Sequence, residues 1–240
     1  KSMKNIGLMD DYVIKHFRIA FGNRIMKQLK TFVPVYVACG GDEVDAIDYF
    51  IAKKIFRKFK TDKNFILIDP VMADNGKLYT GFDKNFALSM AQLCKNADII
   101  VPNLTEASFM LDIPYVAQGY DLEYVKEVLI KLTNLGCKTA ILTGINFGDG
   151  KLGVYGYNKP ENKYFSYFRE HLPKTFHGTG DVFASTLCGA LSIGKDISSA
   201  LKIAVDFTVE SIMLTINNPT ANWYGVDFEK AFPSLIESIK

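Results

Sequence analysis

The chain has 240 residues, a hydrophobic content of 48% and a formal net charge of +2, which is enough apolar material for one globular core of ordinary size. Basic and acidic residues alternate along it, so charge gives no reason to expect nucleic acid or a membrane surface as a partner. No apolar run approaches the roughly 20 residues that cross a bilayer. The scattered cysteines form no CxxC spacing, which favours buried thiols in a cytoplasmic protein over a disulfide framework or a zinc site.

The first part of the chain begins with a helical pattern and has no opening strand. Asp10 is a plausible N-cap for the helix that follows it, and 42–60 has helical spacing with a basic end. Short apolar runs begin between these helices and recur further along, with amphipathic segments at 86–94 and 122–132 between the later ones. The runs are Val33–Cys39, Asn64–Asp69, Asp98–Asn103 and Lys138–Gly144. This alternation is typical of βαβ units and of a parallel sheet that is buried on both faces.

The second half of the chain changes pattern. Segments 151–157 and 162–168 alternate in polarity around the turn residues NKPE, which predicts an antiparallel pair of strands. The C-terminal third is predicted to be helical, at Gly180–Ile193, Ser198–Leu214 and Phe228–Ile239. Because no linker or repeat interrupts the chain, we expect a single domain over residues 1–240.

Polar groups followed by turn formers end three of the apolar runs. The pairs are Asp69-Pro70, Pro102-Asn103 and Thr143-Gly144. Each of them alone is explained equally well as an ordinary turn cap. Together they favour a shared site, because ligands of open parallel sheets bind beyond the carboxyl ends of the strands.

The stretch HGTGD precedes a small-residue apolar run that is predicted to be a buried helix. Gly178 and Gly180 allow close approach of a bound group, and the unpaired N–H groups at the helix start suit phosphate. A simple N-cap role for Asp181 is the alternative.

Further acids lie near this predicted phosphate site. Asp69 and Asp74 share the segment DPVMADNGKLY, and Glu106 lies in NLTE, where it also suits the first turn of a helix. Carboxylates repel phosphate unless a cation lies between them, and Mg²⁺ takes one or two carboxylates together with phosphate oxygens and water.

These motifs together resemble a known family. DPVMADNGKLY, PNLTEA, ILTG, FHGTGDVFAS and YGVDFE occur in the order and approximate spacing of the pyridoxal kinases of the ribokinase superfamily. The resemblance runs from about Val33 to the end of the chain. It implies a three-layer α/β/α sandwich with a mostly parallel central sheet, and ATP-dependent phosphorylation of the 5′-hydroxymethyl group of pyridoxal, pyridoxine or pyridoxamine.

The resemblance also assigns roles to residues. Asp181 would be the catalytic base, and Gly178, Thr179 and Gly180 would form an anion hole. The residues expected along ATP are Asp74, Tyr79, Asn103, Glu106 and Thr143. The residues expected to hold metal are Asp69, Glu106 and Thr143, with Mg²⁺ as the main ion and K⁺ as an open question. The resemblance further implies a cytoplasmic homodimer that binds ATP and a small pyridine-ring substrate.

The chain departs from that family in three places, one of which is Val101, where some relatives have a threonine beside the cation. The opening strand, its Gly-rich loop and the segment that contacts the pyridine ring do not occur, which leads us to expect that the N-terminal part of the family domain is missing. VACGGDE stands where the family often carries a tyrosine near the substrate. Two alternatives therefore stay open: a hydroxymethylpyrimidine (phosphate) kinase, and a non-catalytic relative that binds nucleotide or pyridoxal phosphate.

Overall fold

The computed structural model describes residues 34–35, 37–40, 65–174, 176–221 and 225–240. The chain divides into two compact units, Lys1–Asp62 and Lys63–Lys240. Because so little of the first unit is described, the single domain over residues 1–240 stays a prediction. The helices predicted after Asp10 and at 42–60 lie outside the described residues.

In the first unit, the described residues of the apolar run Val33–Cys39 do not form a strand. Pro34, Val35, Val37 and Ala38 have helical backbone, and the N–H of Cys39 donates to the carbonyl of Val35 at 3.0 Å. Taking this run as part of the βαβ pattern was therefore wrong.

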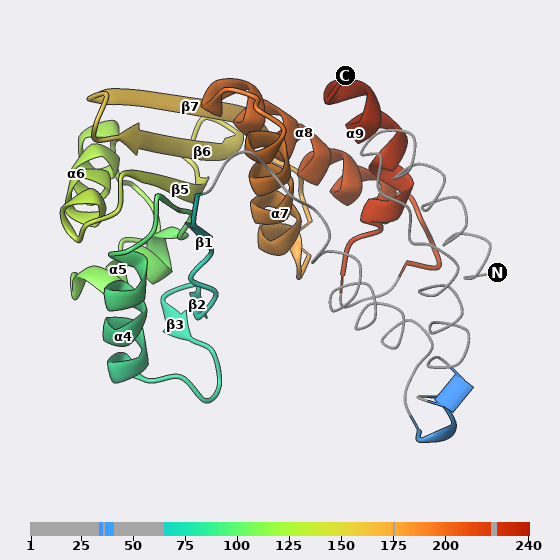
Figure 1. Ribbon diagram of the computed structural model, residues 1–240, viewed down its shortest axis with the longest axis horizontal. Helices are drawn as coiled ribbons and strands as arrows, with labels where there is room; N and C mark the ends of the chain where they lie inside the picture. The colour runs from blue at the N-terminus through green and yellow to red at the C-terminus, as the bar shows by residue number, and fades with distance from the viewer. Residues whose placement is uncertain (1–33, 36, 41–64, 175, 222–224) are drawn as a thin grey trace. The chain divides into compact units, whose positions relative to one another are not determined.

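The second unit is built on a five-stranded sheet in the order β1-β4-β5-β6-β7 (Figure 1). Its strands are β1 (Leu67–Ile68), β4 (Ile99–Ile100), β5 (Thr139–Ile145), β6 (Lys151–Asn158) and β7 (Lys163–Glu170). β1, β4 and β5 are parallel, β6 runs against β5, and β7 runs against β6. Only β6 therefore opposes the other described strands of this sheet, and the predicted antiparallel pair is confirmed.

Helices cover both faces of the sheet. Those of the second unit are α4 (Lys84–Cys94), α5 (Leu104–Leu111), α6 (Leu122–Asn134), α7 (Thr179–Ser192), α8 (Ile197–Ile216), the 3₁₀ helix η3 (Phe228–Ala231) and α9 (Phe232–Ser238). The predicted C-terminal helices are thus confirmed, although the last one begins as η3. None of the helices in the described part of the chain is both long and apolar enough to span a bilayer.

Two buried clusters define the layers. Ala140 and Leu142 of β5 face the cluster that contains α4, α5 and α6, whereas Ile141 between them faces the cluster that contains α7 and α8. This alternation follows from the two-residue period of a strand. Figure 1 shows the green helices α4–α6 on one side of the sheet and the orange α7 and α8 on the other. The expected three-layer α/β/α fold is confirmed.

A small hairpin leaves the sheet after β1. β2 (Ala73–Asp74) pairs antiparallel with β3 (Lys77–Leu78). Asn75 and Gly76 form the two-residue turn with φ angles of 50° and 75°. Asn-Gly tolerates positive φ at both positions and matches the twist of a tight hairpin.

Candidate active site

The carboxyl ends of the parallel strands bring the predicted polar residues together. Asp69 directly follows β1, Asn103 follows β4 as the N-cap of α5, and Thr143 lies in β5. The N–H of Thr143 donates to the carbonyl of Pro102 at 3.0 Å, and Asn103 and Thr143 form a parallel bridge. The three strand ends are therefore neighbours at one edge of the sheet, as ligand sites of such sheets require.

Asn103 and Glu106 form a capping box at the start of α5. The side chain of Asn103 accepts from the N–H of Glu106 at 2.9 Å, and Glu106 Oε2 accepts from the N–H of Asn103 at 2.9 Å. Glu106 Oε1 accepts from the N–H of Met72 at 3.1 Å. The Glu106 carboxylate is thus buried, with both of its oxygens held by backbone donors.

The start of α7 has the opposite character, because no side chain caps it. Gly178 is the N-cap in left-handed conformation, with φ 79° and ψ 0°, and its side-chain position opens into space. Within the described residues, the first backbone N–H of α7 that has a backbone acceptor is that of Val182, which donates to the carbonyl of Gly178 at 3.1 Å. The donors of Thr179, Gly180 and Asp181 are the orphan groups that make a helix start attractive to anions.

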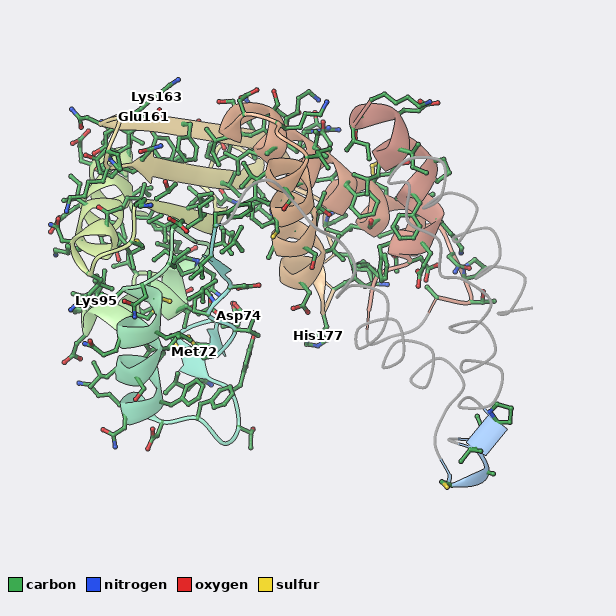
Figure 2. The ribbon with its side chains drawn as sticks, viewed as in Figure 1. Met72, Asp74, Lys95, Glu161, Lys163 and His177 are labelled. Atoms are coloured by element: carbon green, nitrogen blue, oxygen red, sulfur yellow. The ribbon has the colours of Figure 1, made fainter. Side chains whose placement is uncertain are left out.

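One cavity of about 370 Å³ gathers all the residues predicted for the site. They are Asp69, Asp74, Tyr79, Asn103, Glu106, Thr143, Gly178, Thr179, Gly180 and Asp181. Their roles stay predictions, but all ten residues line this one cavity. Figure 2 shows Asp74 on the hairpin and His177 immediately before α7; His177 and His171 also line the cavity.

The cavity wall also contains residues that the sequence motifs did not indicate. Glu170 comes from the end of β7, and Lys174 and Phe176 come from the segment that leads to α7. The ammonium of Lys174 lies 4.9 Å from the centre of the Phe176 ring, which is the geometry of a cation–π contact. Lys174 is the only lysine or arginine among the described lining residues, facing five carboxylates: Asp69, Asp74, Glu106, Glu170 and Asp181. A lysine four residues before the Gly-rich turn was the signal available in the sequence.

The carboxylates of the cavity influence one another. Burial, and after it the negative charge of Asp181, raises the pKa of Asp69 to about 6. Burial raises the pKa of Glu106 to about 7, against the backbone hydrogen bonds that lower it. Burial and then the charges of Asp74, Glu106, Asp69 and Asp181 raise the pKa of Tyr79. Such a concentration of negative charge favours a cation at this site.

The donor set fits Mg²⁺ better than a metal held only by protein. No cluster of three or more His, Cys, Asp and Glu side chains suitable for a metal occurs in the part of the chain that the structure describes. Asp69 accepts no hydrogen bond from a described residue, which leaves its oxygens available, whereas the oxygens of Glu106 already accept from two backbone N–H groups. Mg²⁺ commonly uses one or two carboxylates and completes its shell with water and phosphate.

Comparisons with known proteins identify a family of kinases that the chain resembles. A family model described as phosphomethylpyrimidine kinase matches residues 45–223. The chain is 29% identical over 168 residues to a hydroxymethylpyrimidine/phosphomethylpyrimidine kinase of Aquifex aeolicus, covering 68% of this chain and 62% of that protein. It is 27% identical over 181 residues to a pyridoxal kinase of Dictyostelium discoideum, covering 70% of this chain and 57% of that protein.

A solved structure is also similar. It is the crystal structure of a candidate phosphomethylpyrimidine kinase from Bacteroides thetaiotaomicron in a crystal form with pyridoxal. The identity is 36% and the TM-score 0.67, covering 78% of this chain and 65% of that one. The chain spans less than two thirds of the length of each of these three relatives.

Proposed function

Because the chain belongs to the phosphomethylpyrimidine kinase family, we propose that it transfers the γ-phosphate of ATP to the 5′-hydroxymethyl group of pyridoxal, pyridoxine or pyridoxamine. The observation that carries this proposal is the uncapped start of α7, which opens into the same cavity as Asp69 and Asp181. Phosphoryl transfer depends mainly on positioning and charge neutralisation, and both kinds of group are present on this wall.

The start of α7 supplies two functions within one helical turn. The N–H groups of Gly178, Thr179 and Gly180 form the anion hole for the transferring phosphoryl group; those of Thr179 and Gly180 belong to the first helical turn, which no side chain caps. Asp181, in the same turn, takes the proton of the attacking hydroxyl as general base. The Asp181 carboxylate therefore acts on the attacking hydroxyl, and the N–H donors act on the phosphoryl group that is transferred.

Other residues of the same cavity would hold the cation and the nucleotide. Asp69 would hold Mg²⁺ directly, and Glu106 would act through water because backbone donors occupy its oxygens. Mg²⁺, when bound, neutralises charge on the phosphates. Asp74, Tyr79, Asn103 and Thr143 line the cavity along ATP, with Thr143 beside the cation and Lys174 adding a positive charge from the α7 side. The family resemblance extends the proposal to a cytoplasmic homodimer and leaves a K⁺ requirement open.

A second substrate is favoured by specific relatives. The Aquifex aeolicus protein is named a hydroxymethylpyrimidine/phosphomethylpyrimidine kinase, and the matching family model has the same description. Against this stands the Bacteroides thetaiotaomicron structure with pyridoxal, which has the higher identity. Both substrates present a hydroxymethyl group on a heterocyclic ring, so the α7 chemistry is the same for both.

Steady-state kinetics with both acceptors test the proposal. We expect transfer from Mg·ATP to pyridoxal, with a kcat/KM at least about tenfold above that for hydroxymethylpyrimidine, because ring contacts discriminate between acceptors. A higher kcat/KM for hydroxymethylpyrimidine than for pyridoxal would instead indicate a hydroxymethylpyrimidine kinase. ATP binding without phosphorylation of either acceptor would contradict the kinase proposal and support the non-catalytic relative.

A further inference from the structure

The β2–β3 hairpin carries part of the proposed nucleotide wall. Asp74 ends β2 and Tyr79 directly follows β3, and both line the cavity. Between them lies the tight turn of Asn75 and Gly76. The position of this turn therefore determines the positions of Asp74 and Tyr79, two of the residues proposed to lie along ATP.

Three hydrogen bonds attach the hairpin to the first turn of α5. The N–H of Met72 donates to Glu106 at 3.1 Å, and the side-chain amide of Asn103 donates to the carbonyl of Ala73 at 2.9 Å. Both of these hold the strand that enters the hairpin. The third holds the turn itself, because the N–H of Gly76 donates to Thr105 Oγ1 at 3.1 Å.

Thr105 is well suited to hold the turn. It is 2% exposed and lies on α5 between the capping residues Asn103 and Glu106, so its position is fixed by the helix start. Gly76 also lies against Tyr115: a Cβ at Gly76 would stand 2.8 Å from Cδ1 of that ring.

Within the hairpin, Asn75 donates from its N–H and from its side-chain amide to the Asp74 carboxylate, at 2.8 and 3.0 Å. Outside the hairpin the turn packs between the Tyr115 ring and the Thr105 hydroxyl, and of these two contacts only the hydroxyl provides a directional bond.

We propose that Thr105 is a positioning residue for nucleotide binding. Its hydroxyl fixes the Asn75–Gly76 turn, and through it the places of Asp74 and Tyr79. Thr105 does not line the cavity, so its effect on the nucleotide passes through the hairpin. The kinetic consequence rests on the proposed function, but the contact with the Gly76 amide does not.

The test uses a matched set of variants. Thr105→Val keeps the shape and removes the hydroxyl, and Thr105→Ser restores the hydroxyl. Thr133→Val is the control, because Thr133 is equally buried, at 1% exposure, and its hydroxyl donates to the Ile130 carbonyl at 3.0 Å in α6, away from the cavity. A purely structural effect of losing a buried hydroxyl would be common to both valine variants.

We expect Thr105→Val to speed hydrogen exchange of the Gly76 amide, measured by NMR, by about tenfold or more, because that amide loses its acceptor. KM for ATP should rise about five- to twentyfold, with kcat and the KM for pyridoxal within about twofold of wild type. Thr105→Ser should restore the exchange rate of the Gly76 amide and the KM for ATP. Thr133→Val should lower the melting temperature and leave that exchange rate and that KM unchanged.

Unchanged Gly76 exchange and unchanged KM for ATP in Thr105→Val would overturn the inference. So would an equal rise of KM in Thr133→Val. If Thr105→Val does not fold, exchange in wild type decides: fast exchange of the Gly76 amide contradicts the contact and slow exchange, kept in Thr105→Ser, supports it. A wild-type protein without turnover would refute the proposed function, while Gly76 exchange would still decide the contact.

Discussion

The two buried carboxylates of the cavity differ in what surrounds them. Glu106 accepts hydrogen bonds from the N–H groups of Met72 and Asn103, so its first task is to join the start of α5 to the hairpin. Asp69 accepts none from the described residues, and its pKa is raised by burial and by Asp181. A half-buried carboxylate without donors is stabilised most by a cation, so Asp69 is the stronger candidate for direct contact with Mg²⁺.

These raised pKa values predict how stability depends on pH. The pKa of Asp69 rises from 3.8 to about 6 and that of Glu106 from 4.5 to about 7 on folding. The folded protein therefore binds more protons than the unfolded chain between these values, and the resulting stabilisation is full at low pH and lost as pH rises through the folded pKa values. We expect the ligand-free protein to melt at a lower temperature at about pH 8 than at about pH 5.

Scanning calorimetry of the Asp69→Asn variant isolates the contribution of Asp69 to this pH dependence. Asp69→Asn should flatten the pH dependence of the melting temperature, because the amide does not titrate. Mg²⁺ should raise the melting temperature of wild type more at the higher pH, where the carboxylates are ionised. A variant with the same pH slope as wild type would show that Asp69 does not contribute.

Among the elements, β6 contains two glycines, and aromatic rings of β7 pack against both positions. An added Cβ at Gly156 would stand 2.1 Å from the ring of Phe165, its partner on β7, and one at Gly153 would stand 2.8 Å from the ring of Phe168. The absence of side chains at these positions is therefore what lets β7 pair closely with β6. Because Gly153 also lines the cavity, this packing supports the site wall.

Alanine at Gly156 should therefore destabilise the fold. We expect a loss of about 1–3 kcal/mol in the free energy of unfolding, measured by urea denaturation, because the new methyl group displaces the Phe165 ring. Gly189→Ala in α7 is the matched control, since nothing lies within 4 Å of its added Cβ. That substitution should stabilise by about 0.5–1 kcal/mol through helix propensity. Equal effects of the two substitutions would refute the packing explanation.

Elements with a clear local pattern could be predicted from the sequence. The alternation of 151–157 and 162–168 predicted β6 and β7, and the small-residue run after HGTGD predicted α7. β1 and β4 are each two residues long, shorter than the apolar runs that contain them, because regular pairing ends where the strand ends turn toward the site. The β2–β3 hairpin was not predicted, although Asn75-Gly76 is its turn signal; short strands give too little alternation to detect.

Within residues 63–240, the site depends on contacts between segments that are distant in the chain. The order of the motifs and the polar strand ends predicted which residues meet, and all ten predicted residues line one cavity. Lys174 and Thr105 could not be found in this way. Lys174 reaches the wall because β7 ends nearby, and Thr105 matters because a hairpin thirty residues earlier docks on it. No sequence pattern indicated the Thr105 contact, and for Lys174 the sequence offered only the closeness of a lysine to the Gly-rich turn.

For the molecule as a whole, we propose that this cavity transfers phosphate with Asp181 as the base. The most direct measurement compares γ-phosphate transfer from Mg·ATP to pyridoxal by wild type and by Asp181→Asn, which keeps the side-chain shape and removes the basic carboxylate. We predict that kcat falls by about 10²- to 10⁴-fold, while the Kd for Mg·ATP changes by less than about threefold. A kcat within about threefold of wild type would contradict the central claim.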